Sequence, residues 1–355
     1  MRTPDGSSPS DYDYELPPER IARYPAERRD ESRLLVLTET GGMRHLRFRE
    51  IVEFFRPGDV LVVNQTKVMP ARLLGRKPSG APAEILLVRP APGVADPHLW
   101  EALVRPGSKL KPGRTVVVAD DLSVEILDSA PGGGRVVRLV TDLSLEEALE
   151  RHGHMPLPPY LGREDEPLDR ERYQTVYARD VGSVAAPTAG LHFTPEILAA
   201  LEARGVRRAA VTLHVGIGTF RPVDVDHLDA HEMHHEWYTV SEAAAATVNA
   251  AREAGGRVWA VGTTTVRTLE SVADEQGRVR AATGTTDLFI RPPCAFRAVD
   301  CLLTNFHLPR STLLMLVAAF AGYERTMAAY AEAIRGGYRF YSYGDAMAVV
   351  GPSTG

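Results

Sequence analysis

Four short segments concentrate histidine, threonine and glycine, each directly after a strand-like run of apolar residues. They are PTAGLHF (187–193), HVGIGTF (214–220), GTTTVRT (262–268) and TNFHLPRS (304–311). Histidine transfers protons near neutral pH, and His192, His214 and His307 hold corresponding positions in three segments. In α/β folds, ligands gather at the carboxyl ends of strands. The pattern therefore predicts one ligand site with acid–base histidines; the alternative is that each histidine only hydrogen-bonds within the fold.

The segment GTTTVRT predicts an anion site at the start of a helix. Backbone amides there, with the hydroxyls of Thr263, Thr264 and Thr265, suit a carboxylate or a phosphate. Arg267 either points into that site or pairs with Glu270, and a threonine that only caps the helix is the alternative. The G-x-G of HVGIGTF lacks the third glycine of a dinucleotide-binding fingerprint, so we reject that interpretation.

The segment HEMHHE contains the H-E-x-x-H pattern of zinc proteases. Its members are His231, Glu232 and His235. That chemistry needs both histidines on one helical face, whereas residues 237–240 read as a strand that follows at once. A zinc-dependent hydrolase is therefore an alternative that the local context disfavours, and we predict no metal.

The elements that carry these segments alternate from about residue 183 onwards. Strand, polar loop and helix follow one another, and one helix opens with Thr194 as N-cap and Pro195 at its first position. Such alternation is typical of α/β architecture. We predict a mixed α/β main domain over residues 1–67 and 143–355.

Residues 68–142 have a different texture. Short Val, Leu and Ile runs alternate with Gly and Pro turns, at a spacing of roughly 8–12 residues. This pattern predicts a small all-β, barrel-like domain inserted into the α/β domain.

Composition places few further limits on the chain. Its 355 residues are 44% hydrophobic and 25% charged, with a net charge of −5. The two cysteines are too few for a four-thiolate zinc site. The N-terminus lacks the apolar core of a signal peptide, and the longest apolar stretch, 312–322, is far shorter than the ~20 residues of a membrane span. We predict a cytoplasmic protein, without membrane contact and monomeric.

Charge is unevenly distributed along the chain. Residues 67–114 hold nine Lys and Arg against three acidic residues, and residues 120–180 hold fourteen acidic residues against seven Arg. The two regions are either solvated faces, or the basic one binds a polyanion such as RNA. On the second interpretation the residues that contact the RNA are Arg72, Arg76, Lys77, Lys109 and Lys111.

Ten segments spread from residue 11 to about 347 carry a family resemblance. They are DYDYELPPERIARYP, ESRLLVL, GDVLVVNQTKVMPARLLGRK, HMPLPPYLGREDEPLDRERYQTVYA, SVAAPTAGLHFT, VTLHVGIGTFRPV, HEMHHEWY, VGTTTVRTLES, TNFHLPRSTLLMLVAAFAG and YRFYSYGDAM. In this order they resemble the S-adenosylmethionine:tRNA ribosyltransferase-isomerase family of queuosine biosynthesis. One departure is Gln65, where the family usually has Asn or Asp.

The resemblance implies a reaction and its partners. The ribosyl part of S-adenosylmethionine moves onto the aminomethyl group of preQ1 at the tRNA wobble position. Its rearrangement gives epoxyqueuosine, and adenine and methionine leave. The resemblance implies no metal and no redox cofactor, because S-adenosylmethionine is a co-substrate. It also implies two domains, one α/β and one barrel-like.

The same resemblance suggests roles for the site residues. The catalytic acid–base groups are expected among His192, His214, His234 and His307, and the sequence does not indicate which one is the base. We expect Arg267 and the amides of Thr263–Thr265 to hold the methionine carboxylate. The further substrate-binding residues are Thr188, Gly190, Asn305 and Glu236. The family pattern H-x-M-H-x-E then makes the H-E-x-x-H match accidental.

Two other classes of protein remain as alternatives. A zinc hydrolase would contain stoichiometric metal. A non-catalytic RNA-binding module would use only the β domain, and it would not need four loops rich in histidine and threonine on the other domain. An ordinary methyltransferase would release S-adenosylhomocysteine instead of adenine and methionine.

Overall fold

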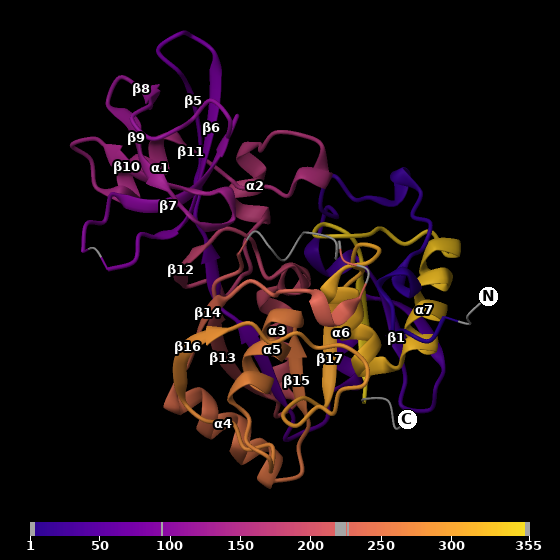
Figure 1. The fold of residues 1–355 in the computed structure, drawn as a ribbon. Coiled ribbons are helices and arrows are strands. Elements are labelled where there is room, and N and C mark those ends of the chain that lie inside the picture. Colours follow the sequence, from indigo (N-terminus) through magenta and orange to yellow (C-terminus); the bar gives the residue numbers. More distant parts are fainter. Residues whose placement is uncertain (1–3, 94, 217–224, 226, 352–355) are drawn as a thin grey trace.

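A nine-stranded sheet forms the body of the molecule. The computed structural model describes residues 4–93, 95–216, 225 and 227–351 (Figure 1). The strand order is β16-β14-β13-β3-β15-β17-β18-β1-β2. In that order the strands are Ala282–Thr286, Glu236–Val240, Arg207–Leu213, Val60–Asn64, Val258–Val261, Cys301–Asn305, Ala346–Val350, Arg33–Leu37 and Met43–Arg47.

Four central strands point the same way. β13, β3, β15 and β17 are mutually parallel, whereas β18 runs antiparallel to β17 and parallel to β1. One edge of the sheet therefore collects the carboxyl ends of four strands and the amino ends of β18 and β1. Polar residues that follow those strands must meet at this edge, which we call the carboxyl edge.

Both faces of the sheet are buried. Successive side chains of a strand point to opposite faces, and in the central strands both sets are apolar. In β3, Val60 and Val62 join an apolar cluster on one face, and Leu61 and Val63 join another cluster on the opposite face. Helices cover these faces and connect the strands. They are α3 (Pro195–Ala203), α4 (Glu242–Glu253), α5 (Thr263–Val272), α6 (Thr312–Ala321) and α7 (Tyr323–Arg335). As predicted, Thr194 caps α3 through a hydrogen bond from the amide of Ile197.

A closed antiparallel barrel stands beside the sheet (Figure 1). Its order is β5-β6-β7-β10-β9-β8, and pairing of β8 with β5 at Arg76 and Val117 closes it. The strands are β5 (Arg72–Arg76), β6 (Pro82–Pro90), β7 (Leu99–Arg105), β8 (Thr115–Ala119), β9 (Leu122–Ser129) and β10 (Arg135–Val140), with β11 (Gly153–His154) added beside β5. The predicted combination of a mixed α/β domain and a small barrel is confirmed.

Helix α1 (Leu145–His152) packs against the barrel, because its Ala148 and Leu149 belong to the barrel's apolar cluster. The domain boundary at residue 142 stays a prediction. Side chains that follow residue 142 in the chain also pack inside the barrel. A two-stranded parallel pair, β4 (Thr66–Val68) with β12 (Asp180–Ser183), lies where the chain enters and leaves this region.

One local expectation differs from the structure. The run SVAA before PTAGLHF is not a strand of the main sheet: β12 ends at Ser183, and PTAGLHF forms a short 3-10 helix, Thr188–His192. The short helix α2 (Pro167–Arg172) ends where the chain leaves helical geometry at Tyr173. Within the described residues, no helix combines the length and apolar character needed to cross a membrane.

Candidate active site at the carboxyl edge of the sheet

The carboxyl edge brings together residues from all four predicted segments. Three of these segments follow strands of the sheet, and the fourth, PTAGLHF, forms the 3-10 helix. Asn305 ends β17, His214 follows β13, and Gly262 follows β15 as the N-cap of α5. The 3-10 helix reaches the same edge from outside the sheet, because Nε2 of His192 lies 3.1 Å from Nδ2 of Asn305. The part of HVGIGTF from residue 217 onwards lies outside the described residues.

His192 is buried, and both of its ring nitrogens have protein partners. Nδ1 lies 2.7 Å from Oγ of Ser32, and the ring stacks on Phe48 with centroids 5.0 Å apart. Burial lowers the pKa of His192 to about 3, and the charges of Arg339 and Arg29 act in the same direction. The imidazole is therefore neutral at physiological pH.

His307 is a second buried histidine at this edge. Its Nε2 lies 2.7 Å from Oγ1 of Thr304, and its backbone amide donates to the hydroxyl of Tyr330. Burial lowers the pKa of His307 to about 3. A neutral imidazole can accept a proton, which a general base requires.

A small cavity of about 40 Å³ lies against His307. Its polar walls are formed by Thr188, Asn305, His307 and Ser342, with the rings of Tyr160 and Tyr341 beside them. Tyr341 holds a φ of 73°, a conformation that a residue with a Cβ adopts at a cost of roughly 1–2 kcal/mol. Backbone strain of this kind collects at functional sites.

Gly190 sits beneath this region for a steric reason. A Cβ at Gly190 would collide with the hydroxyl of Tyr177 and approach Thr175 to 2.8 Å. The position thus allows the 3-10 helix to lie close to the chain that precedes β12. Gly190 itself is buried and does not line the cavity wall.

His214 occupies the other end of the edge. Its Nδ1 lies 2.8 Å from Oγ1 of Thr66, and its ring stacks on Trp237 with centroids 5.0 Å apart. Burial lowers the pKa of His214, and Asp180 opposes that shift. Two strands separate β13 from β17, so His214 lies roughly 14 Å from Asn305 at a strand spacing of about 4.8 Å.

Between these histidines lies the N-terminus of α5. Oγ1 of Thr265 donates to the carbonyl of Val261, and Oγ1 of Thr264 accepts from Nδ2 of Asn64 at 3.3 Å. Thr263 is buried at the first helical position. The first amides of a helix have no partner within it, and the helix dipole adds positive potential there. This end of α5 can therefore receive a carboxylate.

Arg267 of α5 has its partners in the segments around β14 and β16. Its guanidinium forms an ion pair with Glu236, and both side chains are 3% exposed. Nε of Arg267 also donates to the carbonyl of Leu288 at 3.0 Å. Glu270 instead accepts from the amides of Arg297 and Ala298. Of the two alternatives weighed from the sequence, pairing with Glu270 is not found, and the guanidinium pairs with the predicted site residue Glu236, whose Oε1 accepts from the amide of Gly216 beyond β13.

The HEMHHE segment is not helical. Apart from His231, which ends a short 3-10 turn, it runs as an extended chain into β14, and His234 and His235 are exposed. Within the described part of the chain, no group of three or more His, Cys, Asp or Glu side chains could hold a metal ion. The geometry therefore gives the zinc hydrolase no support.

All five basic residues proposed for tRNA lie on the barrel. Arg76, Lys109 and Lys111 are exposed, and Lys77 is half-buried. Arg72 differs, because its guanidinium pairs with Glu84 at 3.1 Å. Four of the five cations are thus available to solvent, and Arg72 is already neutralised in part.

Several residues that complete the edge were not predicted. Asn64 joins three neighbouring elements: its side chain bonds to the carbonyl and amide of Leu213, to the amide of Thr66 and to Thr264. A polar residue closing the apolar run VLVVN was a signal for it. Ser32 had no comparable signal, since its partner His192 is 160 positions away.

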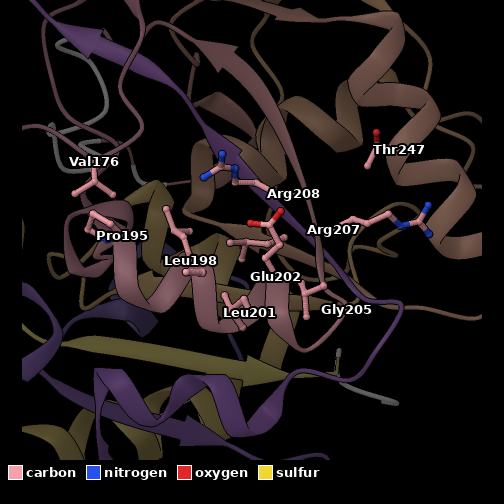
Figure 2. Close-up of a pocket in the computed structure, with 12 residues that line it drawn as sticks. Val176, Pro195, Leu198, Leu201, Glu202, Gly205, Arg207, Arg208 and Thr247 are labelled. Carbon is pink, nitrogen blue, oxygen red and sulfur yellow. The ribbon is translucent and has the colours of Figure 1, made fainter.

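A groove of about 780 Å³ lies elsewhere, between α3 and the start of β13 (Figure 2). Leu198, Leu201 and Glu202 line it from α3, and Arg207 and Arg208 from β13. It sits at the amino end of β13, whereas His214 follows the carboxyl end. The groove and the polar edge therefore lie at opposite ends of the strand.

Comparison with known proteins finds relatives along almost the whole chain. The family model described as queuosine biosynthesis protein matches residues 9–349. A protein of Symbiobacterium thermophilum named S-adenosylmethionine:tRNA ribosyltransferase-isomerase is 54% identical over 344 residues, which cover 96% of this chain and 99% of the relative. A protein of Moorella thermoacetica with the same name is 53% identical over the same shares.

One solved structure adds to these relatives. The crystal structure of an S-adenosylmethionine tRNA ribosyltransferase from Thermotoga maritima matches with 42% identity and a TM-score of 0.55. The match covers 96% of this chain and 99% of the other. The sheet, the closed barrel and the polar edge define an enzyme of mixed α/β class. The chain belongs to the family of queuosine biosynthesis proteins, and the resemblance inferred from its motifs is confirmed.

Proposed function

We propose that this protein transfers the ribosyl moiety of S-adenosylmethionine onto the aminomethyl group of preQ1 at the wobble position of tRNA and isomerises it. The products are epoxyqueuosine-tRNA, adenine and methionine. Membership in the family supports this assignment, as do the names of its relatives. S-adenosylmethionine is consumed as a co-substrate, and we propose a reaction without a resident cofactor.

The observation that carries the proposal is the spacing of groups along the carboxyl edge. The neutral histidines His214 and His307 follow β13 and β17, two strands that lie roughly 14 Å apart, and the start of α5 lies between them. S-adenosylmethionine is elongated, with a base at one end and an amino acid at the other. An edge of this length can hold both ends of that molecule at once.

The chemistry needs a base near the sulfonium. The positive sulfur acidifies the C5′ protons, so removal of one gives an ylide-like carbanion that begins the ribosyl rearrangement. His307 beside the cavity and His214 at the far end are both neutral and are the proposed acid–base groups. Each such group contributes about 10²–10⁴-fold to the rate. His234, exposed before β14, takes part only if the bound tRNA covers it.

The methionine carboxylate needs positive potential. We assign it to the amides of Thr263 and Thr264 at the start of α5, where the helix dipole favours an anion. Arg267 supports this helix from the side through its pair with Glu236. Phosphates of the tRNA are assigned to the exposed cations of the barrel, chiefly Arg76 and Lys109.

The test is release of adenine. The protein is incubated with S-adenosylmethionine and an anticodon stem-loop that carries preQ1, beside a control stem-loop that carries guanine. Adenine and methionine should appear in equal amounts, and only with the preQ1 RNA. Formation of S-adenosylhomocysteine, or no adenine at all, would overturn the proposal.

A further inference from the structure

Asn305 carries a buried polar atom that has no protein partner among the described residues. The atom is the side-chain oxygen Oδ1, and the residue is 2% exposed. The same side chain lines the cavity that Thr188, His307 and Tyr341 share. Buried polar groups almost always have a hydrogen-bond partner, because an unpaired one loses its hydration without compensation. A ligand in this cavity can supply the missing donor.

The other end of the amide fixes its orientation. Nδ2 of Asn305 lies 3.2 Å from the carbonyl oxygen of Tyr341 and 3.5 Å from that of Asp345. Carbonyl oxygens only accept hydrogen bonds, so the group that faces them must be the NH₂. Oδ1 is therefore the atom left for a ligand, and it can only accept.

His192 holds this amide in place. Oγ of Ser32 donates to the carbonyl of Arg29 at 3.2 Å, so it accepts from Nδ1–H of His192. The opposite ring nitrogen, Nε2, then accepts from Nδ2 of Asn305. Both nitrogens of His192 are engaged, which makes it a positioning residue that acts through Asn305.

We propose that Oδ1 of Asn305 accepts a hydrogen bond from an amino group of a planar nitrogenous base bound in this cavity. The inference rests on the proposed function, whose two substrates both bring such a base. The rings of Tyr160 and Tyr341 border the same cavity and pack against each other, with centroids 4.6 Å apart and planes tilted by 52°, so a single ring face is what the cavity offers for stacking.

Entry of a base requires the cavity to widen. Its volume of about 40 Å³ holds only a few atoms, and a hydrogen bond joins two of its lining residues, Tyr160 and Ser342. Tyr160 lies in the segment that returns from the barrel, whereas Ser342 precedes β18. Separation of these two side chains opens the path to Oδ1.

The first experiment alters the ligand and leaves the protein intact. In one arm, calorimetry compares S-adenosylmethionine with its analogue that lacks the 6-amino group. In the other arm, the preQ1 stem-loop is compared with a stem-loop whose wobble base lacks the 2-amino group. The wild-type protein should prefer the amino form in one arm by about 10-fold, the effect of one unpaired buried acceptor.

Variants then assign the preference to Asn305. Asn305→Ala should remove it, and His192→Ala should weaken it, while His192→Gln restores an acceptor for Nδ2 and recovers part of it. Asn249→Ala is the matched control: Asn249 is a buried asparagine of α4 whose amide bonds to Val279, away from the edge. It should destabilise the protein and leave the preference unchanged.

Each outcome decides the matter. Loss of preference by Asn305→Ala in the first arm assigns the base to the ribosyl donor, and loss in the second arm assigns it to the RNA. No preference in either arm of the wild type, or a preference that survives Asn305→Ala, overturns the inference. Normal adenine release with no preference contradicts this inference alone, whereas a preference without adenine release contradicts only the proposed function.

Discussion

Gly182 and His214 are in direct steric contact: a Cβ placed on Gly182 would lie 2.6 Å from Nε2 of His214. Gly182 belongs to β12, beside the chain that leads into the barrel, and His214 follows β13 of the main sheet. The absence of a side chain at position 182 therefore sets where the imidazole of His214 lies.

Substitution of Gly182 should disturb catalysis through His214. Gly182→Ala pushes the imidazole away, and a displacement of about 1 Å can lower a rate by about 10²-fold. Single-turnover adenine release measures this. Gly255→Ala is the control, because Gly255 also has a positive φ of 79° but a Cβ there meets nothing within 4 Å. Equal rates in the two variants would show that His214 has no part in the chemistry.

The ion pair between Arg267 and Glu236 should matter for stability. Both side chains are buried, so Arg267→Met leaves a buried carboxylate without its cationic partner and should lower the free energy of unfolding by about 3–5 kcal/mol. The double variant Arg267→Met/Glu236→Leu should recover most of that loss. Urea denaturation measures both. A double variant as unstable as the sum of the single variants would contradict the prediction.

Two buried neutral histidines should make the protein sensitive to acid. The pKa values of His192 and His307 fall from 6.5 to about 3 on folding, so the unfolded chain binds more protons below pH 6.5. The free energy of unfolding should therefore fall as the pH drops, by about 1.4 kcal/mol per pH unit for each histidine. The stabilising contribution of the two neutral histidines is fully present at pH values above the pKa of histidine in the unfolded chain.

Removal of one histidine tests that slope. Between about pH 6 and pH 4, His307→Gln should reduce the slope of the unfolding free energy against pH by the contribution of one bound proton. Urea titrations at several pH values measure that slope. The exposed His235 is the control, and His235→Gln should leave the slope unchanged. An unaltered slope in His307→Gln would mean that His307 is protonated in the folded state.

Charge reversal on the barrel should weaken tRNA binding. Arg76→Glu with Lys77→Glu should raise the KM for tRNA and reduce the salt dependence of binding, by about 0.7–0.9 in the logarithmic slope for each phosphate that the variant no longer neutralises. Arg72→Ala should have a smaller effect, because Arg72 already pairs with Glu84. Arg278→Glu, on the main domain, serves as the control. A KM that does not change would place the RNA on another face.

Metal removal should leave the activity unchanged. The segment that contains His231, Glu232 and His235 lacks the helix that a zinc protease needs. A short turn ends at His231, and no helix follows it before β14. Adenine release after dialysis against a chelator, compared with an untreated sample, measures this. Loss of activity that zinc restores would revive the hydrolase alternative.

Local sequence patterns predicted much of the fold. The apolar runs indicated the barrel strands, and Thr194 marked the start of α3. His214 and Asn305 were expected at one sheet edge because both follow apolar runs, and they lie there. These features depend on neighbouring residues, which the sequence displays directly.

Features that depend on distant residues were not predictable in this way. The pairing of Arg267 with Glu236 joins residues 31 positions apart, and no periodicity connects them. Closure of the barrel depends on contact between Arg76 and Val117, which requires the register of every strand between them. The orientation of the Asn305 amide follows from two carbonyl groups that only the folded chain brings near.

The position of β18 has a consequence for how the chain folds during synthesis. This last strand lies between β17 and β1, and its preceding residue, Asp345, binds the amide of Arg33, 312 positions earlier. At roughly 5–20 residues per second, the ribosome delivers that partner about 15–60 s after β1 emerges. Throughout that interval β1 presents an apolar edge with no neighbour on one side. Early pairing of β1 with β2 covers only the opposite side of β1, so the newborn chain must keep this edge from pairing with other chains until β18 arrives.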